Sequence, residues 1–319
     1  MKNNNNINTV TIFGGNSYLG SNLYNFLTNI NYNVNLIQRK NVNSPFNNES
    51  ITKIDYNDIN AIKNSLNNCD LLIMCIGLSD TLCEENPINS IKVNIELVMT
   101  ILDIAISNGI KNIFYFSSIH VYTNNLSGEI SEMTPVLNYH PYAISKITVE
   151  NYLRWYSKKH HLNINILRIS NVYGVSFNDN LTNWNLFINN FCKQAISGVI
   201  KLKSNVMTYR NIISLVEFNN QIDFLIKKLN NSRKFRIINI GTDYNASVLD
   251  FAKLIADRCY KILKINVVIN KNKLVANNSH DLNFLNFNRN VIKKMGYSTQ
   301  NNILTEIDSL LTICFNKKK

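Results

Sequence analysis

The sequence predicts an α/β fold built on a doubly wound parallel sheet, with a smaller C-terminal α/β domain. Apolar runs typical of strands alternate with helical patterns through the first half, and a glycine-rich turn joins the first run to the first helix. Parallel strands need crossover connections, and strands covered on both faces are apolar throughout. The chain has 319 residues, 45% of them hydrophobic, which is enough to bury such a core and excludes a fibrous or wholly disordered protein.

The first half is expected to supply the sheet and its crossover helices. Strands are predicted at Thr9–Phe13, Val34–Ile37, Ile51–Asp55, Asp70–Ile76, Asn112–Phe116 and Ile164–Ile169. Helices are predicted at Leu19–Leu27, Pro87–Ser107 and Pro141–His160, from the spacing of their apolar residues. The segment DLLIMCI at 70–76 is a continuous apolar run, as a strand buried on both faces requires. Such alternation gives right-handed βαβ units, whose sheets bind ligands at the carboxyl ends of their strands.

The second half is less regular. Helical patterns cover Asn183–Ser197, Leu215–Leu229, Val248–Tyr260 and Ile303–Phe315, and strands are predicted at Arg236–Ile240 and Ile265–Ile269. We assign residues 1–172 to the sheet domain, with 212–245 returning to it. Residues 173–211 and 246–319 are assigned to the second domain. The sequence shows no internal repeat.

Charge is distributed unevenly along the chain. The 33 Lys and Arg residues against 21 Asp and Glu give a net charge of +12. Residues 1–150 hold 8 basic and 12 acidic residues, a net charge of −4, whereas residues 151–319 hold 25 and 9, a net charge of +16. A basic half predicts an anionic partner: nucleic acid, a membrane surface or a phosphorylated small molecule. The sign of the charge does not choose among these three.

Cysteine spacing and hydropathy indicate a soluble cytoplasmic protein. The six cysteines form no CxxC pair and no metal-ligand spacing, so we expect buried free thiols and neither a disulfide framework nor a metal site. The polar N-terminal segment has no signal-peptide pattern. No apolar run approaches the ~20 residues that a membrane span needs.

The first strand leads into a glycine-rich loop with the sequence Gly14-Gly15-Asn16-Ser17-Tyr18-Leu19-Gly20. Gly14 permits a tight turn, and the small Asn16 and Ser17 let the backbone approach a pyrophosphate at the N-terminus of the following helix. Gly20 lets that helix approach the sheet. The alternative is an ordinary turn with coincidental glycines, but the flanking strand and helix favour a dinucleotide loop.

The end of the second predicted strand indicates which dinucleotide is bound. An acid there would hydrogen-bond the ribose hydroxyls of NAD, whereas this chain has Gln38-Arg39-Lys40. A neutral residue followed by two cations favours NADP(H) over NAD(H), because Arg39 can pair with the additional phosphate. The alternative is that Arg39 and Lys40 are solvated loop charges.

A second group of residues, which includes a tyrosine, a lysine and two serines, is suited to acid–base chemistry. Tyr142 and Lys146 are four residues apart at the start of a predicted helix, and so share one face. We expect the ammonium to lower the tyrosine pKa from its ordinary value of ~10. Ser117 and Ser118 follow a predicted strand at the ligand-binding edge, where a serine hydroxyl can bond a carbonyl or alcohol oxygen while the tyrosine moves its proton.

These motifs, in this order, resemble the extended short-chain dehydrogenase/reductases, and among them the NAD(P)-dependent nucleotide-sugar epimerase/dehydratase family. The matching segments are GGNSYLG at 14–20, DY at 55–56, DLLIMCIG at 70–77, VN at 93–94, FSSIHVY at 116–122, PYAISK at 141–146, LRISNVYG at 167–174, RNII at 210–213 and INIG at 238–241. They cover nearly the whole chain and are specific to the family, not to one activity. The resemblance implies a Rossmann-type sheet domain and a nucleotide-sugar domain.

The resemblance also implies residue roles. Ser118 would be the catalytic serine, Tyr142 the acid/base, and Lys146 both its electrostatic partner and a ligand of the cofactor ribose. The implied binding residues are Asp55 and Tyr56 beside the adenine, Cys75 to Gly77 along the cofactor, Asn171 at the substrate diphosphate, and Arg210 at the nucleotide-sugar phosphates. For Arg210, the alternative is a surface charge.

Two departures from related enzymes narrow the activity. Ile119-His120 stands where sugar-nucleotide 4,6-dehydratases carry Asp-Glu, so that elimination lacks its acid. GDP-fucose-synthase-like enzymes need a cysteine near the serine, and none is near Ser118 in the sequence. We expect His120 to contact the substrate; packing or acid–base work are the alternatives.

The expected function is reduction of a nucleotide-activated 4-keto-6-deoxyhexose at C4, with Tyr142 as the acid. The alternative is a nucleotide-sugar 4-epimerase that binds NAD tightly. A non-catalytic protein that binds nucleic acid or a regulatory partner is more distant, because the catalytic residues are intact and the basic residues are dispersed. The resemblance implies a homodimer through the Tyr142–Lys146 helix. Its apolar Ile144, Ile147, Val149, Leu153 and Trp155 fit that interface or an internal core.

Overall fold

The structure is a computed structural model that describes residues 7–40, 46, 51–123, 126–178, 181–202, 208–229, 234–271, 284–299 and 303–318. The chain divides into two compact units. Unit 1 comprises Met1–Tyr122, Pro135–Ile169 and Gln221–Ile238, and unit 2 comprises Thr123–Thr134, Ser170–Asn220 and Asn239–Lys319.

Unit 1 is organised around a seven-stranded sheet. Its strands are β1 (Thr9–Phe13), β2 (Asn33–Arg39), β3 (Ile51–Ile54), β4 (Leu71–Met74), β5 (Asn112–Ser118), β7 (Asn163–Ile169) and β11 (Phe235–Ile240). They lie in the order β11-β7-β5-β4-β1-β2-β3. The order reverses at β1, which pairs in parallel with β2 on one side and β4 on the other. Ligands of open α/β sheets bind beside such a reversal, at the carboxyl ends of the strands. The predicted doubly wound sheet is confirmed.

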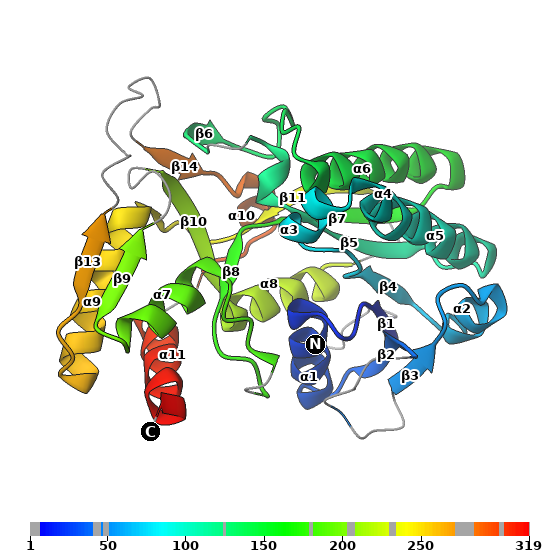
Figure 1. The fold of residues 1–319 in the computed structure, drawn as a ribbon. Helices are drawn as coiled ribbons and strands as arrows, with labels where there is room; N and C mark the ends of the chain where they lie inside the picture. Colours follow the sequence, from blue (N-terminus) through cyan, green and yellow to red (C-terminus); the bar gives the residue numbers. More distant parts are fainter. Residues whose placement is uncertain are drawn as a thin grey trace. The chain divides into compact units, whose positions relative to one another are not determined.

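The helices of unit 1 cover both faces of this sheet. They are α1 (Tyr18–Asn29), α2 (Ile59–Ser65), α3 (Asp80–Glu85), α4 (Pro87–Ser90), α5 (Leu97–Ser107) and α6 (Pro141–His160), while α8 (Leu215–Lys227) contains a boundary between the units. Figure 1 shows α5 and α6 on one face and α1 on the other. This follows from right-handed crossovers that run in opposite directions away from β1.

Local sequence accounts for where the main helices begin. α1 follows Ser17, whose Oγ accepts a hydrogen bond from the Gly20 amide at 3.0 Å. α6 begins with Pro141, whose fixed φ suits a first helical position, and it ends at His161 in the left-handed conformation. The predicted helix Pro87–Ser107 is wrong as a single α-helix, because a π-helical turn, η1 (Ile91–Glu96), joins α4 to α5.

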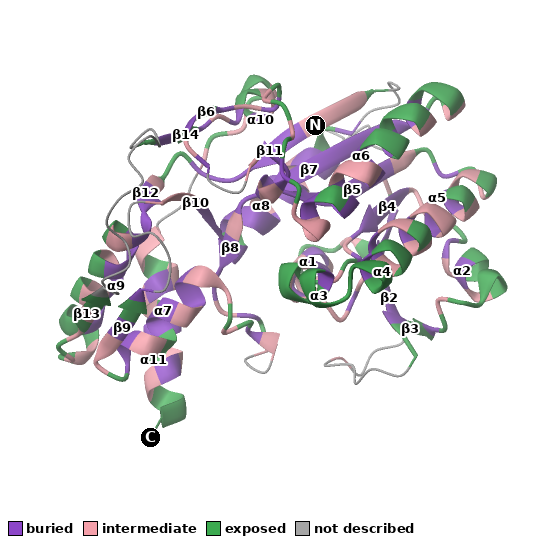
Figure 2. Ribbon diagram, turned by 45° about the horizontal axis from the view of Figure 1, so that its top comes forward, coloured by how far each residue is buried: buried purple, intermediate pink, exposed green. Residues whose placement is uncertain are grey.

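The core of unit 1 lies on both faces of the sheet, and Figure 2 shows its central strands as buried. Apolar side chains from the strands meet those of α2, α5 and α6. The cluster includes Phe13, Ile37, Ile62, Leu72, Ile101, Ile113, Leu153 and Ile164. This burial explains why the strands are apolar throughout and do not alternate with polar residues.

The described residues of unit 2 form three small sheets and several helices. Its strands are β6 (Gly128–Ile130), β8 (Asn171–Tyr173), β9 (Val199–Leu202), β10 (Tyr209–Ser214), β12 (Asn245–Ser247), β13 (Val268–Lys271) and β14 (Leu285–Phe287). They form the sheets β12-β10-β8, β13-β9 and β14-β6. Its helices are α7 (Phe187–Ala195), α9 (Val248–Leu263), α10 (Asn290–Lys294) and α11 (Ile303–Lys318). A second core, with Phe191, Phe251, Ile255 and Leu310, lies among α7, α9 and α11.

The units divide the chain at other residues than the predicted boundaries. Segment 212–220, predicted to return to the sheet domain, belongs to unit 2, because β10 pairs with β8 and β12 there. Residues 123–134 also belong to unit 2, where β6 pairs with β14. The strand predicted at Ile265–Ile269 lies three residues later, at Val268–Lys271, because it pairs with β9 from Val199 onward.

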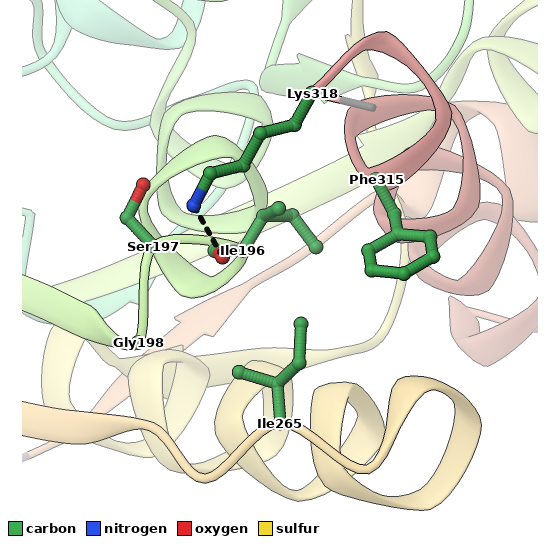
Figure 3. A pocket seen from close by; sticks show the side chains of 6 residues that line it. All are labelled: Ile196, Ser197, Gly198, Ile265, Phe315 and Lys318. Carbon is green, nitrogen blue, oxygen red and sulfur yellow. Dashed lines mark hydrogen bonds between the residues drawn. The ribbon is translucent and has the colours of Figure 1, made fainter.

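A cavity of about 440 Å³ opens in unit 2. It is lined by Ile196, Ser197, Gly198, Ile265, Phe315 and Lys318. Figure 3 shows the three apolar side chains around a common space, and Lys318 Nζ donates to the Ile196 carbonyl at 3.2 Å. None of these six residues is a predicted site residue, so this cavity is not the predicted site. Among the described residues, no helix is long and apolar enough to cross a membrane, and no group of His, Cys, Asp and Glu could hold a metal ion.

Candidate active site

The glycine-rich loop leaves no room for side chains at its turns. Gly14 has a φ of +98°, and a Cβ atom there would lie 2.8 Å from the carbonyl carbon of Cys75. A Cβ at Gly20 would lie 2.5 Å from the Gly14 carbonyl oxygen. The Gly14 and Gly15 amides both donate to the Ile37 carbonyl, at 3.3 and 3.1 Å. The loop is therefore held against the ends of β2 and β4, with the N-terminus of α1 beside it.

The end of β2 presents one buried amide and one exposed cation. Gln38 is fully buried and its Nε2 donates to the Gly15 carbonyl at 3.2 Å, while its Oε1 has no hydrogen-bond partner among the described residues. Arg39 is exposed and forms no ion pair within the described part of the chain. Burial raises the pKa of the nearby Tyr56 to about 12, while Arg39 opposes this rise. Asp55 is exposed, and its Oδ1 accepts from the Asn57 amide at 2.9 Å.

The predicted catalytic residues come together at the carboxyl end of β5. Ser118 is the last residue of β5, and Tyr142 and Lys146 lie in the first turns of α6. Ser118 forms a side-chain hydrogen bond with Tyr142. Lys146 Nζ donates to the Phe116 carbonyl at 3.0 Å and lies 5.8 Å from the centre of the Tyr142 ring. The end of β5 and the start of α6 thus bring Ser118 together with Tyr142 and Lys146, which lie more than 20 residues later in the sequence.

The pKa of Tyr142 is raised, whereas it was expected from the sequence to be lowered. Burial raises the pKa of Tyr142 to about 12, and the hydrogen bond from Ser118 lowers it only in part. Burial also lowers the pKa of Lys146 to about 8. Desolvation disfavours the charged form of each of these two side chains. At neutral pH, Tyr142 is therefore a neutral phenol with a proton to donate.

The two adjacent serines have different surroundings. Ser118 bonds Tyr142 and also accepts from the His120 amide at 3.2 Å. Ser117 donates to Glu150 Oε1 at 2.6 Å in the buried interior. Successive residues of a strand point to opposite faces, so only one of the pair can face the tyrosine. The half-buried His120 follows Ser118, and its carbonyl accepts from Asn138 Nδ2 at 2.6 Å.

At this cluster Asn94 was not assigned a role from the sequence, whereas Gly77 was assigned to the cofactor. Asn94, in the π-helical turn, is fully buried; its Oδ1 accepts from the Leu78 amide at 2.7 Å and its Nδ2 donates to Ser145 Oγ at 3.0 Å. A Cβ at the exposed Gly77 would lie 3.2 Å from Lys146 Nζ. The VN motif at 93–94 was the available signal, and π-helical turns are frequent at functional sites.

No cysteine is near Ser118 in the sequence, but two cysteines lie near Lys146 of the same cluster in the structure. Cys75, after β4, and Cys83, in α3, both act electrostatically on Lys146. Burial raises the pKa of the Cys75 thiol well above its ordinary value. The Cys75 thiol is therefore a neutral neighbour of the lysine at physiological pH.

The predicted phosphate ligands lie together in unit 2. Asn171 begins β8 and pairs in register with Ile212 of β10, two residues beyond Arg210. Asn171 Nδ2 donates to the Asn211 carbonyl at 2.8 Å, and Arg210 Nη1 donates to the Tyr209 carbonyl at 3.2 Å. Burial lowers the pKa of Arg210, and it forms no ion pair with any described residue. A half-buried guanidinium without a carboxylate partner among the described residues suits an anionic ligand.

The sequence matches the model of the NAD dependent epimerase/dehydratase family over residues 10–241. The chain belongs to this family. The predicted family and the prediction of an enzyme are thereby confirmed. None of the curated proteins matches the sequence.

Solved structures of family-like proteins share the fold at low sequence identity. One is UDP-N-acetylglucosamine 4-epimerase from Methanobrevibacter ruminantium, in complex with UDP-N-acetylmuramic acid: 20% identity, TM-score 0.79, covering 98% of this chain and 99% of that one. Another is Thermus thermophilus UDP-glucose 4-epimerase in complex with NAD: 16% identity, TM-score 0.76, covering 96% and 98%. A third is RMD from Pseudomonas aeruginosa, complexed with NADPH: 13% identity, TM-score 0.75, covering 97% and 99%. These likenesses extend over the full epimerase/dehydratase fold.

Proposed function

We propose that this epimerase/dehydratase-family protein reduces a nucleotide-activated 4-keto-6-deoxyhexose at C4, with NADPH favoured over NADH. The observation that carries the proposal is Tyr142, hydrogen-bonded to Ser118, with Lys146 Nζ 5.8 Å from the centre of its ring. A phenol whose pKa is raised to about 12 holds a proton at neutral pH. Reduction of a ketone needs such a donor at the oxygen, whereas oxidation of an alcohol first needs a base there.

The residues around the loop fit a dinucleotide. Its turns exclude side chains, the N-terminus of α1 favours a phosphate, and the Oε1 of Gln38 is an unpaired buried acceptor. Gly14 to Gly20 would hold the pyrophosphate, Arg39, Asp55 and Tyr56 the adenosine end, and Cys75, Gly77 and Lys146 the nicotinamide end. When bound, the dinucleotide supplies or accepts the hydride. Arg39, exposed and without a carboxylate partner among the described residues, supports the preference for NADP(H).

The catalytic residues divide the proton chemistry among them. Ser118 would donate a hydrogen bond to the sugar carbonyl oxygen and orient it toward Tyr142. Tyr142 would give its proton to that oxygen as the carbonyl becomes an alcohol. The Lys146 ammonium would stabilise the phenolate left behind. Lys146 is held in place by the Phe116 carbonyl at 3.0 Å.

The substrate is inferred to be a nucleotide-diphosphate sugar. Arg210 and Asn171 lie on neighbouring strands, and the guanidinium has no carboxylate partner among the described residues. The net charge of +16 over residues 151–319 also favours an anionic ligand. We assign Arg210 and Asn171 to the diphosphate and His120 to a sugar contact.

A 4-epimerase is the second candidate, because two of the similar structures reported above are UDP-sugar 4-epimerases. In that reaction Tyr142 would act as a base and then as an acid. The discriminating experiment incubates the purified protein with NADPH and a 4-keto-6-deoxy nucleotide sugar, and separately with UDP-hexoses and no added cofactor. Consumption of NADPH supports the reductase. Interconversion of UDP-hexoses, together with NAD that copurifies and is identified by mass spectrometry, supports the epimerase.

We further infer a homodimer through α6. Val149 and Leu153 are fully buried in unit 1, so these two predicted interface positions are internal core. Ile144 and Trp155 are 46% and 51% exposed, which leaves an apolar face on the same helix. Sedimentation of the wild type against Ile144→Lys tests this: the dimer predicts a wild-type species of twice the mass that the variant loses.

A further inference from the structure

A buried ion pair lies behind the catalytic cluster of unit 1. Arg168 Nη2 and Nε donate to the two carboxylate oxygens of Glu150, at 2.6 and 3.1 Å. The two side chains are 4% and 5% exposed. The guanidinium also lies 4.7 Å from the centre of the Tyr122 ring. Burying two charges costs so much desolvation that such a pair contributes little net stability over an apolar replacement.

The Glu150–Arg168 pair is linked to Lys146 through α6 and to Ser118 through the adjacent Ser117. Glu150 lies four residues after Lys146, on the same face of α6. Its Oε1 accepts from Ser117, the residue before Ser118, at 2.6 Å. Arg168, on β7, is the register partner of Ser117 on β5. The pair therefore joins the catalytic helix to β7 and to β5, the strand that ends at Ser118.

We propose that Glu150 and Arg168 form a positioning pair: Glu150 supplies the counter-charge of the Lys146 ammonium, and Arg168 limits that counter-charge while the pair holds the end of β5 against α6. This inference concerns the reaction assigned above and rests on that proposed function. Neither residue is expected to touch the substrate or cofactor.

Glu150 is the carboxylate among the groups that act on Lys146. The other titratable neighbours of Lys146 and Tyr142 are Cys75 from the end of β4, Asp80 and Cys83 from α3, and Tyr115 from β5. Burial lowers the pKa of Lys146, and the effects of Cys75, Cys83 and Glu150 oppose this. Burial raises the pKa values of Cys75 and Tyr115, so these groups stay neutral and cannot replace Glu150. Asp80 is exposed, so solvent screens its charge.

The test follows the Lys146 ammonium directly by NMR titration of protein carrying ¹⁵N-labelled lysine side chains, with the Lys146 signal assigned through Lys146→Arg. Glu150→Gln leaves Arg168 uncompensated, so the titration midpoint of Lys146 should fall by about one pH unit. Arg168→Gln leaves Glu150 uncompensated, so the midpoint should rise by a similar amount. The Lys146 midpoint of the double variant should lie between those of the two single variants. Asp308→Asn, in the partly exposed Arg258–Asp308 pair of unit 2, is the matched control and should leave the midpoint unchanged.

Shifts of the two single variants in the same direction, or no shift in either, would overturn the charge role. Ser117→Ala tests the positioning role without changing a buried charge, and serves if either single variant does not fold. It should lower kcat several-fold with KM and the Lys146 midpoint unchanged; a wild-type kcat would overturn that role. The NMR midpoints need no substrate. Opposite shifts in a protein that reduces no 4-keto sugar would therefore refute the proposed function and leave the pair's electrostatic role supported.

Discussion

One arginine of unit 1 and one of unit 2, Arg168 and Arg210, are held in different ways. In unit 1, Arg168 is buried against Glu150 with two short hydrogen bonds. In unit 2, Arg210 is half-buried and has no carboxylate partner within the described residues. An arginine whose charge is neutralised by a carboxylate can orient its neighbours but attracts an anionic ligand weakly. An arginine without such a partner attracts an anion strongly. We therefore expect changes at the catalytic cluster of unit 1 to lower kcat and changes at Arg210 to raise KM.

The largest effect is expected from Tyr142→Phe. Removing the hydroxyl removes the proton donor, and general acid catalysis contributes about 10²–10⁴-fold. Steady-state kinetics should show kcat lowered by that factor with KM little changed. Tyr115→Phe is the matched control, because its buried hydroxyl has no hydrogen-bond partner among the described residues. An equal loss in both variants would contradict the assignment of the acid.

Arg210→Ala should affect binding. Loss of a charge-assisted hydrogen bond to a phosphate costs about 1.5–3 kcal/mol, which is about 10- to 150-fold in KM. The kcat value should change far less. Arg236→Ala is the matched control: burial lowers the pKa of Arg236 also, but it lies on β11. A fall in kcat at constant KM for Arg210→Ala would remove the distinction between the units.

The pH profile should report Lys146. The pKa of Tyr142 is raised to about 12, so the phenol remains protonated across the working range. The Lys146 ammonium is lost as pH rises through about 8, so kcat should decline above that pH and be constant below it. Lys146→Arg keeps its charge at every accessible pH. Its profile should be flatter, and the same decline in this variant would show that another group titrates.

The smallest effect is expected at the exposed Arg39. Arg39→Ala should weaken NADPH binding by about tenfold, the equivalent of ~1.4 kcal/mol, and leave NADH binding unchanged. Fluorescence titration of each cofactor measures this. Lys40→Ala controls for general surface charge, since Lys40 is equally exposed. Equal weakening for NADPH and NADH would indicate that Arg39 does not read the additional phosphate.

The parts predictable from sequence are those with a local pattern. β1 and α6 have the predicted bounds, because a buried strand and a helix beginning at Pro141 are recognisable in a short window. The glycine loop and the Tyr142–Lys146 spacing are local in the same sense. The short β6, β8 and β14 were not predicted, since three-residue strands have no detectable periodicity.

Properties that depend on tertiary contacts were missed or predicted with the wrong sign. The pKa of Tyr142 depends on how deeply it is buried, and the distinct surroundings of Ser117 and Ser118 depend on the face of β5 that each occupies. The Glu150–Arg168 pair joins residues 18 positions apart on different elements, which no spacing rule reveals. The π-helical turn contains Asn94, whose buried hydrogen bonds go to residues far along the chain.

The most direct test of the central claim is NADPH consumption by the purified protein with a 4-keto-6-deoxy nucleotide sugar, measured beside Tyr142→Phe. The account predicts steady oxidation of NADPH by the wild type, formation of the C4 alcohol, and a loss of about 10²–10⁴-fold in the variant. No NADPH oxidation by a folded wild type that binds the cofactor, or an undiminished rate in Tyr142→Phe, would contradict it.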